Sequence, residues 1–452
     1  MNSPVASDLV ARLDSFDAAE RREALVRLAR SATRGAPVQK RPEVNLHCHT
    51  FFSFNAYGYS PSRFAWEAHR YGLEVAGIVD FDVLDGLEEF LSAGRLLGLK
   101  SVAGFETRAF VEEHRDKVTN SPHEPGVAYF ITTGFAAPPE QGTADAEILA
   151  SMRQCARRRN TRMLERINEY LDPVTIDYQK DVLPLTPAGN ATERHMLVAY
   201  ESRAREIFGA EDELARFWSE KLDEPVESVR RLLEDVVALK NTIRSRLMKY
   251  GGVGYAAPEE GSFPDLNDVL AMTLNCGALP SGGWLDGTND GEADPVRLFQ
   301  FWLAKGIPTV TVIPDRNWNV KDPQERAVKV ANLHRALEAA LSLDMPVLVG
   351  TEMNSYGQKF VDTFSTAELA PYGRAFVEGA HFAWGHALLK ATAGVGSTGA
   401  WAVAHFGEDA VQRNRFFQRV GRGPHPDEET MRRLTALGPE AEPEDVLDVL
   451  EV

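Results

Sequence analysis

The sequence predicts an α/β protein built on a distorted (β/α)7 barrel of the TIM type, with a helical insertion and C-terminal helices. Short β-rich runs alternate with helix-like segments from Glu43 onward, which is the pattern of βα units in a parallel sheet or barrel. The strand candidates number seven, and polar side chains follow the ends of several of them. Barrel enzymes place their sites at the carboxyl ends of their strands, so these side chains are the first candidates for chemistry.

Residues 1–40 are expected to form an N-terminal helix and a linker, because residues 5–33 are amphipathic and "GAPVQKRP" follows them. The first part of the barrel is assigned to residues 41–142. Its first helix covers "SPSRFAWEAHRYG", which begins with Ser60 and ends with Gly72, and a second covers residues 84–98. The strands of this part are expected at residues 43–49, 74–81, 100–110 and 126–135.

A long helical stretch, residues 143–255, interrupts this alternation, and its clearest helices span residues 144–171 and 225–250. Loops accept long insertions at a small entropic cost, so we interpret the stretch as an insertion into one βα loop. The βα pattern resumes over residues 256–360 as the second part of the barrel. Residues 361–452 are expected to form a C-terminal helical extension.

The composition restricts the class of partner. The net charge of −17 over 452 residues argues against nucleic acid or an anionic membrane as the main partner. The three cysteines form no C-x-x-C pair, so neither a disulfide framework nor a thiolate zinc site is indicated. The N-terminus has no apolar signal core and the apolar runs are far shorter than a membrane span. We therefore expect a cytoplasmic protein with a small-molecule substrate. The composition does not exclude assembly into a homo-oligomer.

The strand ends carry imidazoles and carboxylates. His47 and His49 end the first strand, and two residues apart they point to the same face. Later strands end in acidic or basic residues, namely Asp80, Asp82, Glu106, Asp315, Arg316 and Glu352. Imidazoles and carboxylates that converge on one barrel mouth are what a divalent metal needs. The alternatives are that a histidine at a strand end is structural and that the two aspartates cap the next helix.

The order of these motifs resembles the PHP family, the polymerase and histidinol phosphatase metallophosphoesterases. The family opens with H-x-H-T-x-x-S, which is "HCHTFFS" here, and continues with "AHRYGLEVAGIVDFD" and "GFE". The pieces "RRNTRMLERI" and "ATERHMLVAY" are similar to parts of a helical insert in relatives that act on nucleotides. "CGALPSGGW" and "GTEMN" resemble the later barrel motifs. The resemblance covers residues 43–356 and implies a distorted seven-stranded barrel.

Several positions depart from the family pattern. Residues that are histidine ligands in the family are here Phe81, Tyr129, Ser281 or Gly282, and Asn354. Phenyl cannot bind a metal, and phenol and amide are poorer ligands than imidazole. The resemblance therefore implies that His47, His49, Glu106 and Glu352 keep one divalent ion (Mn, Zn or Fe) and that the chain binds fewer than three.

An anionic substrate requires cations at the barrel mouth. Arg316 is the best single candidate because of its place at a strand end, and the other candidates are Arg108, Lys359, Arg194 and His195. Asp80 or Asp315 could act as a general base. Together with these residues, the resemblance to the PHP family implies a metal-dependent hydrolase, a phosphoesterase that acts on a small phosphorylated metabolite or nucleotide. The alternatives are a single-metal lyase, isomerase or non-phosphate hydrolase, and a barrel that binds a ligand without turnover.

Overall fold

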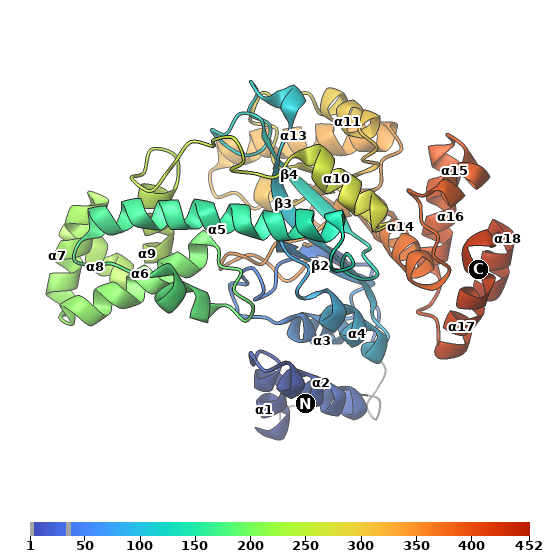
Figure 1. The fold of residues 1–452 in the computed structure, drawn as a ribbon, viewed down its shortest axis with the longest axis horizontal. Coiled ribbons are helices and arrows are strands. Elements are labelled where there is room, and N and C mark those ends of the chain that lie inside the picture. The colour runs from blue at the N-terminus through green and yellow to red at the C-terminus, as the bar shows by residue number, and fades with distance from the viewer. Residues whose placement is uncertain (1–3, 33–37) are drawn as a thin grey trace. The chain divides into compact units, whose positions relative to one another are not determined.

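The computed structural model describes residues 4–32 and 38–452. Its strands form one seven-stranded sheet in which each strand pairs with the next along the chain, with helices packed around it (Figure 1). The strands are β1 (Val44–Cys48), β2 (Val75–Phe81), β3 (Lys100–Phe110), β4 (Val127–Thr133), β5 (Leu279–Trp284), β6 (Thr309–Val312) and β7 (Val347–Val349). Every residue of β1, β5, β6 and β7 is buried, as expected of strands covered on both faces.

The sheet is nearly closed into a barrel. The strands β1 to β3 are parallel, and so are β5 to β7, whereas β4 runs antiparallel to both of its neighbours. The segment after β7 returns to β1, where the His49 N–H donates to the Glu352 carbonyl and the Glu352 N–H to the His47 carbonyl, both at 2.8 Å. The predicted α/β barrel is confirmed, and the reversed β4 is the distortion.

One glycine permits this closure. A Cβ atom on Gly350, directly after β7, would lie 2.4 Å from the backbone nitrogen of His47. Any larger residue would push the end of β7 away from β1. The close approach therefore brings the loop that carries Glu352 beside the strand that carries the two histidines.

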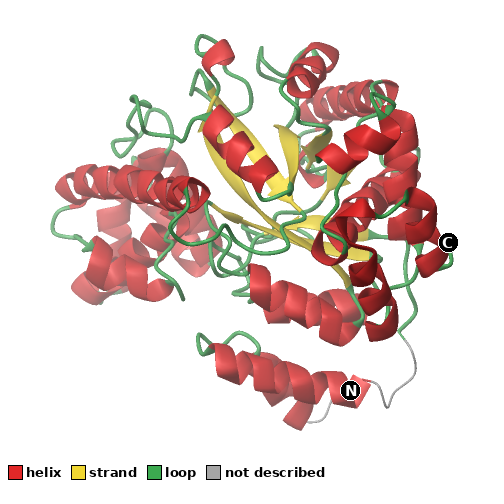
Figure 2. Cartoon of the chain, turned by 45° about the vertical axis from the view of Figure 1, so that its right-hand side comes forward, coloured by secondary structure: helices red, strands yellow, loops and turns green. Residues whose placement is uncertain are grey.

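Helices follow the barrel strands. The helix α3 (Pro61–Tyr71) begins where the Ser60 side chain accepts a hydrogen bond from the Arg63 N–H, and it ends at Gly72 in the left-handed conformation. Its neighbour α4 (Leu87–Leu97) also ends at a left-handed glycine. The later barrel helices are α10 (Leu266–Asn275), α11 (Pro295–Ala304), the short α12 (Asp315–Trp318) and α13 (Pro323–Ser342). Figure 2 shows the strands in yellow with helices in red around them.

The N-terminal part contains two helices where the sequence predicts one. The helix α1 (Pro4–Arg12) ends before a turn, and α2 (Ala18–Ala32) begins after it. The break lies at "LDSFD", because the Asp17 carboxylate accepts a hydrogen bond from the Ala19 N–H at 2.8 Å. Short polar side chains that bond to nearby backbone groups compete with a continuous helix. Residue 33 of the predicted helix and residues 35–37 of the predicted linker lie outside the described residues.

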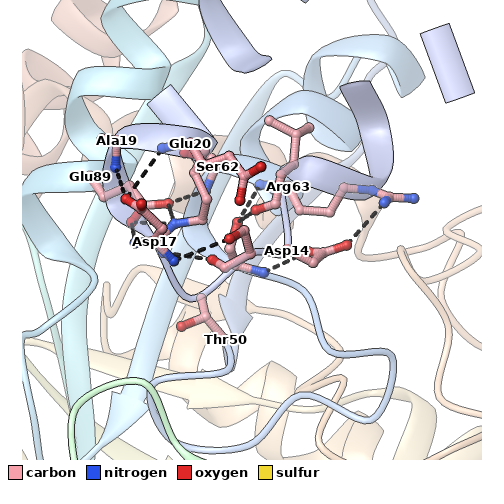
Figure 3. A network of polar contacts seen from close by, with 12 residues as sticks. Asp14, Asp17, Ala19, Glu20, Thr50, Ser62, Arg63 and Glu89 are labelled. Carbon is pink, nitrogen blue, oxygen red and sulfur yellow. Dashed lines mark hydrogen bonds and ion pairs between the residues drawn. The ribbon is translucent and has the colours of Figure 1, made fainter. Parts of the chain in front are cut away.

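Ion pairs attach these two helices to the first barrel helices (Figure 3). Arg21, which is only 3% exposed, donates from Nε to both carboxylate oxygens of Glu89 on α4, at 3.0 and 3.1 Å. The Asp14 carboxylate accepts from the Ser60 N–H and from the Arg63 guanidinium, each at 3.0 Å. The N-terminal helices are thus an ordered layer over α3 and α4.

Residues 51–54 and 150–263 form a second compact unit, separate from the rest of the chain. It holds most of α5 (Ala144–Leu171) together with α6 (Glu193–Phe208), α7 (Glu211–Leu222), α8 (Val226–Glu234) and α9 (Val236–Ile243). The unit has its own core, in which Tyr200 and Trp218 are fully buried. Arginines of α5 fix the segment before residue 264, since Arg159 donates to the Ser262 carbonyl and Arg166 to the Tyr255 carbonyl, both at 2.6 Å.

The C-terminal extension consists of α14 (Gly373–Thr392), α15 (Ala400–Phe406), α16 (Ala410–Arg422), α17 (Glu428–Leu437) and α18 (Pro443–Leu450). Buried polar contacts join it to the barrel. The Glu74 carboxylate, just before β2, meets the Lys100 ammonium at 2.5 Å and the His381 Nε2 of α14 at 3.1 Å. Lys100 also donates to the Gly421 carbonyl of α16 at 3.0 Å. Within the described ranges, none of the helices has the length and hydropathy needed to cross a membrane.

Candidate metal centre

Three buried side chains from β1, the residue beyond it and β3 converge on one point. The Nε2 atoms of His47 and His49 each lie 3.0 Å from the same carboxylate oxygen, Oε2 of Glu106. The candidate ligand atoms of all three residues lie within 4.8 Å of one another. His47, His49 and Glu106 are 2%, 0% and 4% exposed, so bulk water does not surround the group. We call these three residues the metal group.

The surroundings of Glu106 favour its ionised form. Burial opposes the ionisation of Glu106, but the two histidines outweigh burial and lower its pKa to about 2. Glu106 is therefore a carboxylate at neutral pH. An ionised carboxylate beside two imidazoles is the donor set that divalent metals bind through one oxygen and two nitrogens.

The spacing fits a bound ion. Ligand atoms about 2.1 Å from a metal and roughly at right angles around it lie about 3 Å from each other. The two nitrogen–oxygen separations in the metal group have this value. Two imidazoles and one carboxylate suit zinc, iron or manganese and leave further coordination positions for water or substrate. The residues present therefore fit a single divalent ion.

Glu352 is held beside the metal group by other partners. Its Oε1 accepts from the Arg316 guanidinium at 3.1 Å, and its Oε2 accepts from the Gln358 side-chain amide at 2.8 Å. Burial opposes its ionisation, but the charge of Arg316 lowers its pKa nonetheless. Glu352 is not one of the three clustered ligands, so its role as a fourth ligand stays a prediction.

The aspartates that end β2 support the strands on either side. The Asp80 carboxylate accepts from the Thr50 N–H at 2.7 Å and from its hydroxyl at 2.6 Å. The Asp82 carboxylate accepts from the Thr107 hydroxyl at 2.5 Å. The alternative that either aspartate is the N-cap of α4 is wrong, since that position is Gly86. A general-base role for Asp80 stays a prediction.

Two of the residues that depart from the family pattern lie against the metal group or near it. The Phe81 ring stacks on the His49 imidazole, with 4.1 Å between centroids and 21° between planes. Tyr129 pairs with Arg108 across β3 and β4, and burial raises the pKa of its phenol. Farther round the barrel, the Ser281 hydroxyl bonds with the Thr311 hydroxyl at 2.7 Å. Phe81, Tyr129 and Ser281 thus place a phenyl, a phenol and a hydroxyl group at these positions, and none of the three side chains is an imidazole.

The predicted cations at the barrel already have partners. Arg316 pairs with Glu352, and Arg108 pairs with Glu124 at 2.7 Å. The Lys359 ammonium lies 3.8 Å from the centre of the Trp318 ring and 3.9 Å from an Asp315 carboxylate oxygen. Burial raises the pKa of Asp315. A guanidinium has five N–H donors, so Arg316, whose side chain is 43% exposed, retains donors for a second anion.

Arg194 and His195 belong to the second compact unit, at the start of α6. The Thr192 N–H donates to the His195 Nδ1 at 3.0 Å, which caps the helix. Burial lowers the pKa of His195 to about 4, so the ring is neutral at pH 7. The Phe54 ring contacts His195, with 5.1 Å between centroids. Contact of these two residues with a substrate stays a prediction.

Sequence reasoning missed three supporting residues. Gln358 binds Glu352, and Thr50 and Thr107 bind the two aspartates. The two threonines directly follow His49 and Glu106 in "HCHT" and "FET", so the signal was a hydroxyl residue next to each proposed ligand. No pattern in the sequence pointed to Gln358, because its contact with Glu352 depends on the backbone conformation of the loop after β7.

No protein-family model matches the chain, and no curated protein matches its sequence. Two solved structures are similar in fold. One is an amidohydrolase from Chromobacterium violaceum with bound sulfate and no metal, at 15% identity and a TM-score of 0.49, covering 75% of this chain and 96% of that one. The other, described as a metal-dependent phosphoesterase, is from Bifidobacterium adolescentis, at 18% identity and a TM-score of 0.45, covering 74% of this chain and 97% of that one. Neither likeness is close enough to assign an activity, so function is inferred from the side chains.

Proposed function

We propose that this chain is a metal-dependent hydrolase of the PHP type that uses one divalent ion to cleave a small phosphorylated metabolite or nucleotide. The observation that carries the proposal is the metal group, in which one buried carboxylate oxygen lies 3.0 Å from two imidazole nitrogens. Buried ionisable groups that converge at strand ends are rarely tolerated for stability alone. The resemblance of the sequence to the PHP family supports the same reaction class.

The chain's own residues have distinct tasks in this proposal. When bound, a divalent ion supplies Lewis acidity, which activates water and polarises a phosphoryl oxygen. Arg316 orients the anionic group of the substrate through the guanidinium donors that Glu352 does not use. Asp315, whose pKa burial raises, accepts a proton near the barrel mouth. Arg108 and Lys359 add positive charge there.

A second reaction type has its own support. Phe81 stacks on His49 where the PHP pattern has another ligand, and a phenyl ring cannot bind a second ion. Phosphoesterases that clamp the attacking and leaving oxygens between adjacent metals need that second ion. A single-metal lyase, isomerase or non-phosphate hydrolase would not need it.

A comparison of phosphate release separates these possibilities. The wild-type chain and the variants His47→Ala and Glu106→Gln are assayed with p-nitrophenyl phosphate and nucleoside monophosphates in added Mn²⁺, Zn²⁺ or Fe²⁺. We expect metal-dependent turnover that falls at least about 100-fold in both variants. His69→Ala, on the outer helix α3, is the matched control and should retain activity. Bound metal without phosphate release would favour the second reaction type, and turnover that survives His47→Ala would contradict the proposal.

A further inference from the structure

A cavity of about 540 Å³ lies in the C-terminal extension. Its walls are the end of α14, the loop that follows it, α15 and a turn at Pro439–Glu442. Figure 1 shows α14, α15 and α16 together on one side of the barrel unit. None of the lining residues belongs to the metal group or to the cations near it. The volume falls within the range of about 300–1,000 Å³ that is typical of small-molecule sites.

A lysine without a counter-ion lines the cavity. Lys390, in the last turn of α14, is half-buried, and among the described residues it has no ion pair or hydrogen bond. Its side chain lies over Gly277, where an added Cβ atom would come within 2.3 Å of the ammonium nitrogen. A partly buried cation that lacks a partner is costly, and an anion that enters the cavity would remove this cost.

A buried histidine fixes two walls of the cavity. His386 is fully buried, and its Nδ1 accepts from the Ser397 N–H at 3.0 Å while its Nε2 donates to the Gly277 carbonyl at 3.1 Å. These two bonds tie the loop after α14 to the turn beneath Lys390. The cavity is therefore formed in advance, as sites for small molecules usually are.

The opposite wall is aromatic. Trp401 and His405 line the cavity with their ring centroids 4.7 Å apart, and the Trp401 indole N–H donates to the Ala441 carbonyl at 2.7 Å, which fixes the ring. Aromatic faces attract planar ligand rings. Two acidic residues, Glu440 and Glu442, also line the cavity, and both are exposed, so water screens their charges. The Glu442 carboxylate lies 3.6 Å from His405.

We propose that this cavity binds a small molecule that carries a planar ring and an anionic group. The anionic group, a carboxylate or a phosphate, pairs with Lys390, and the ring packs on Trp401. The site is separate from the metal group, and its occupancy does not depend on the proposed function.

Ligand-observed NMR with two matched probes tests this assignment. Benzoate carries the ring and the charge, whereas benzamide has the same shape without the charge. We expect benzoate to bind the full-length chain with a dissociation constant of about a millimolar, and benzamide at least about tenfold more weakly. Inorganic phosphate should compete with benzoate, because both need the ammonium.

Variants locate the probe. Lys390→Met should weaken benzoate binding about tenfold at an unchanged thermal midpoint, and Lys390→Arg should preserve it, since one buried charge pair contributes that much. Lys359→Met, near the barrel mouth, is the matched control and should leave the affinity for benzoate unchanged. The comparison of benzoate with benzamide on the wild-type chain needs no variant and stands even where a variant fails to fold.

Several results would overturn the assignment. The first is the absence of benzoate binding at concentrations well above a millimolar, and the second is equal binding of benzamide. Benzoate binding that Lys390→Met leaves unchanged would also overturn it. Benzoate binding that is lost in Lys359→Met would overturn it as well, because it would place the probe at the barrel mouth.

Discussion

Asp80 accepts two hydrogen bonds from Thr50, one from its backbone N–H at 2.7 Å and one from its hydroxyl at 2.6 Å. Thr50 directly follows His49, so this pair fixes the chain next to a candidate ligand. On the other side of β2, Asp82 holds Thr107, the residue after Glu106. The end of β2 thus orients both neighbouring strands that supply the metal group.

The first prediction concerns Asp80→Asn. Asparagine has one acceptor oxygen in place of two and no negative charge, so the charge-assisted bond from the Thr50 hydroxyl is lost and the orientation of His49 is less fixed. We expect metal affinity to fall about 10- to 100-fold, which is typical for residues that orient ligands. Competition with a metal-binding dye measures this. Thr50→Ser keeps the hydroxyl and should be nearly neutral. A fall in kcat with unchanged metal affinity would instead indicate that Asp80 is a general base.

The second prediction concerns Arg316→Met. The guanidinium pairs with Glu352 and retains N–H donors that we assign to the substrate. Removing them should raise KM for an anionic substrate about tenfold or more, since a charged hydrogen bond contributes about 1.5–3 kcal/mol. Metal content should stay unchanged. Steady-state kinetics measure this, with the exposed Arg297→Met as the control. Loss of metal in Arg316→Met would show that the pair with Glu352 supports the metal group.

The third prediction concerns acid stability through Glu74. The hydrogen bond from His381 lowers the pKa of Glu74 to about 2, with a further contribution from Lys100, against the opposing effect of burial. Because the folded-state pKa is below the unfolded value, the stabilisation is present above about pH 4.5 and is lost as the pH falls towards 2. Glu74→Gln should therefore lower the free energy of unfolding by on the order of 2 kcal/mol at pH 7.

Urea titrations at pH 7 and pH 3 check this dependence. The difference in free energy between wild type and Glu74→Gln should shrink as the solution is acidified. The exposed Glu444→Gln on α18 is the control and should show little difference at either pH. If the free-energy difference between wild type and Glu74→Gln is the same at pH 7 and pH 3, packing and not the charge of Glu74 explains the effect.

The alternation of side chains along strands explains how much the sequence could predict. His47 and His49 are two residues apart at the end of the first predicted strand, and Glu106 follows an apolar run, so the convergence of these three residues was foreseeable. The reversed direction of β4 was not, because a strand's own sequence does not record whether its neighbour is parallel. The pairing of Arg316 with Glu352 depends on the turn after β7, where Glu352 has a positive φ of 63°. A residue pattern does not specify such a backbone turn.

Metal content per chain tests the central claim most directly. Elemental analysis of protein purified without chelator or metal-affinity tag should find about one divalent ion in the wild type and none in His47→Ala, because the variant keeps only His49 and Glu106 of the metal group. His69→Ala should keep the ion. Two or three ions per chain would contradict the single site, and no ion even after supplementation would contradict the assignment of His47, His49 and Glu106 as ligands.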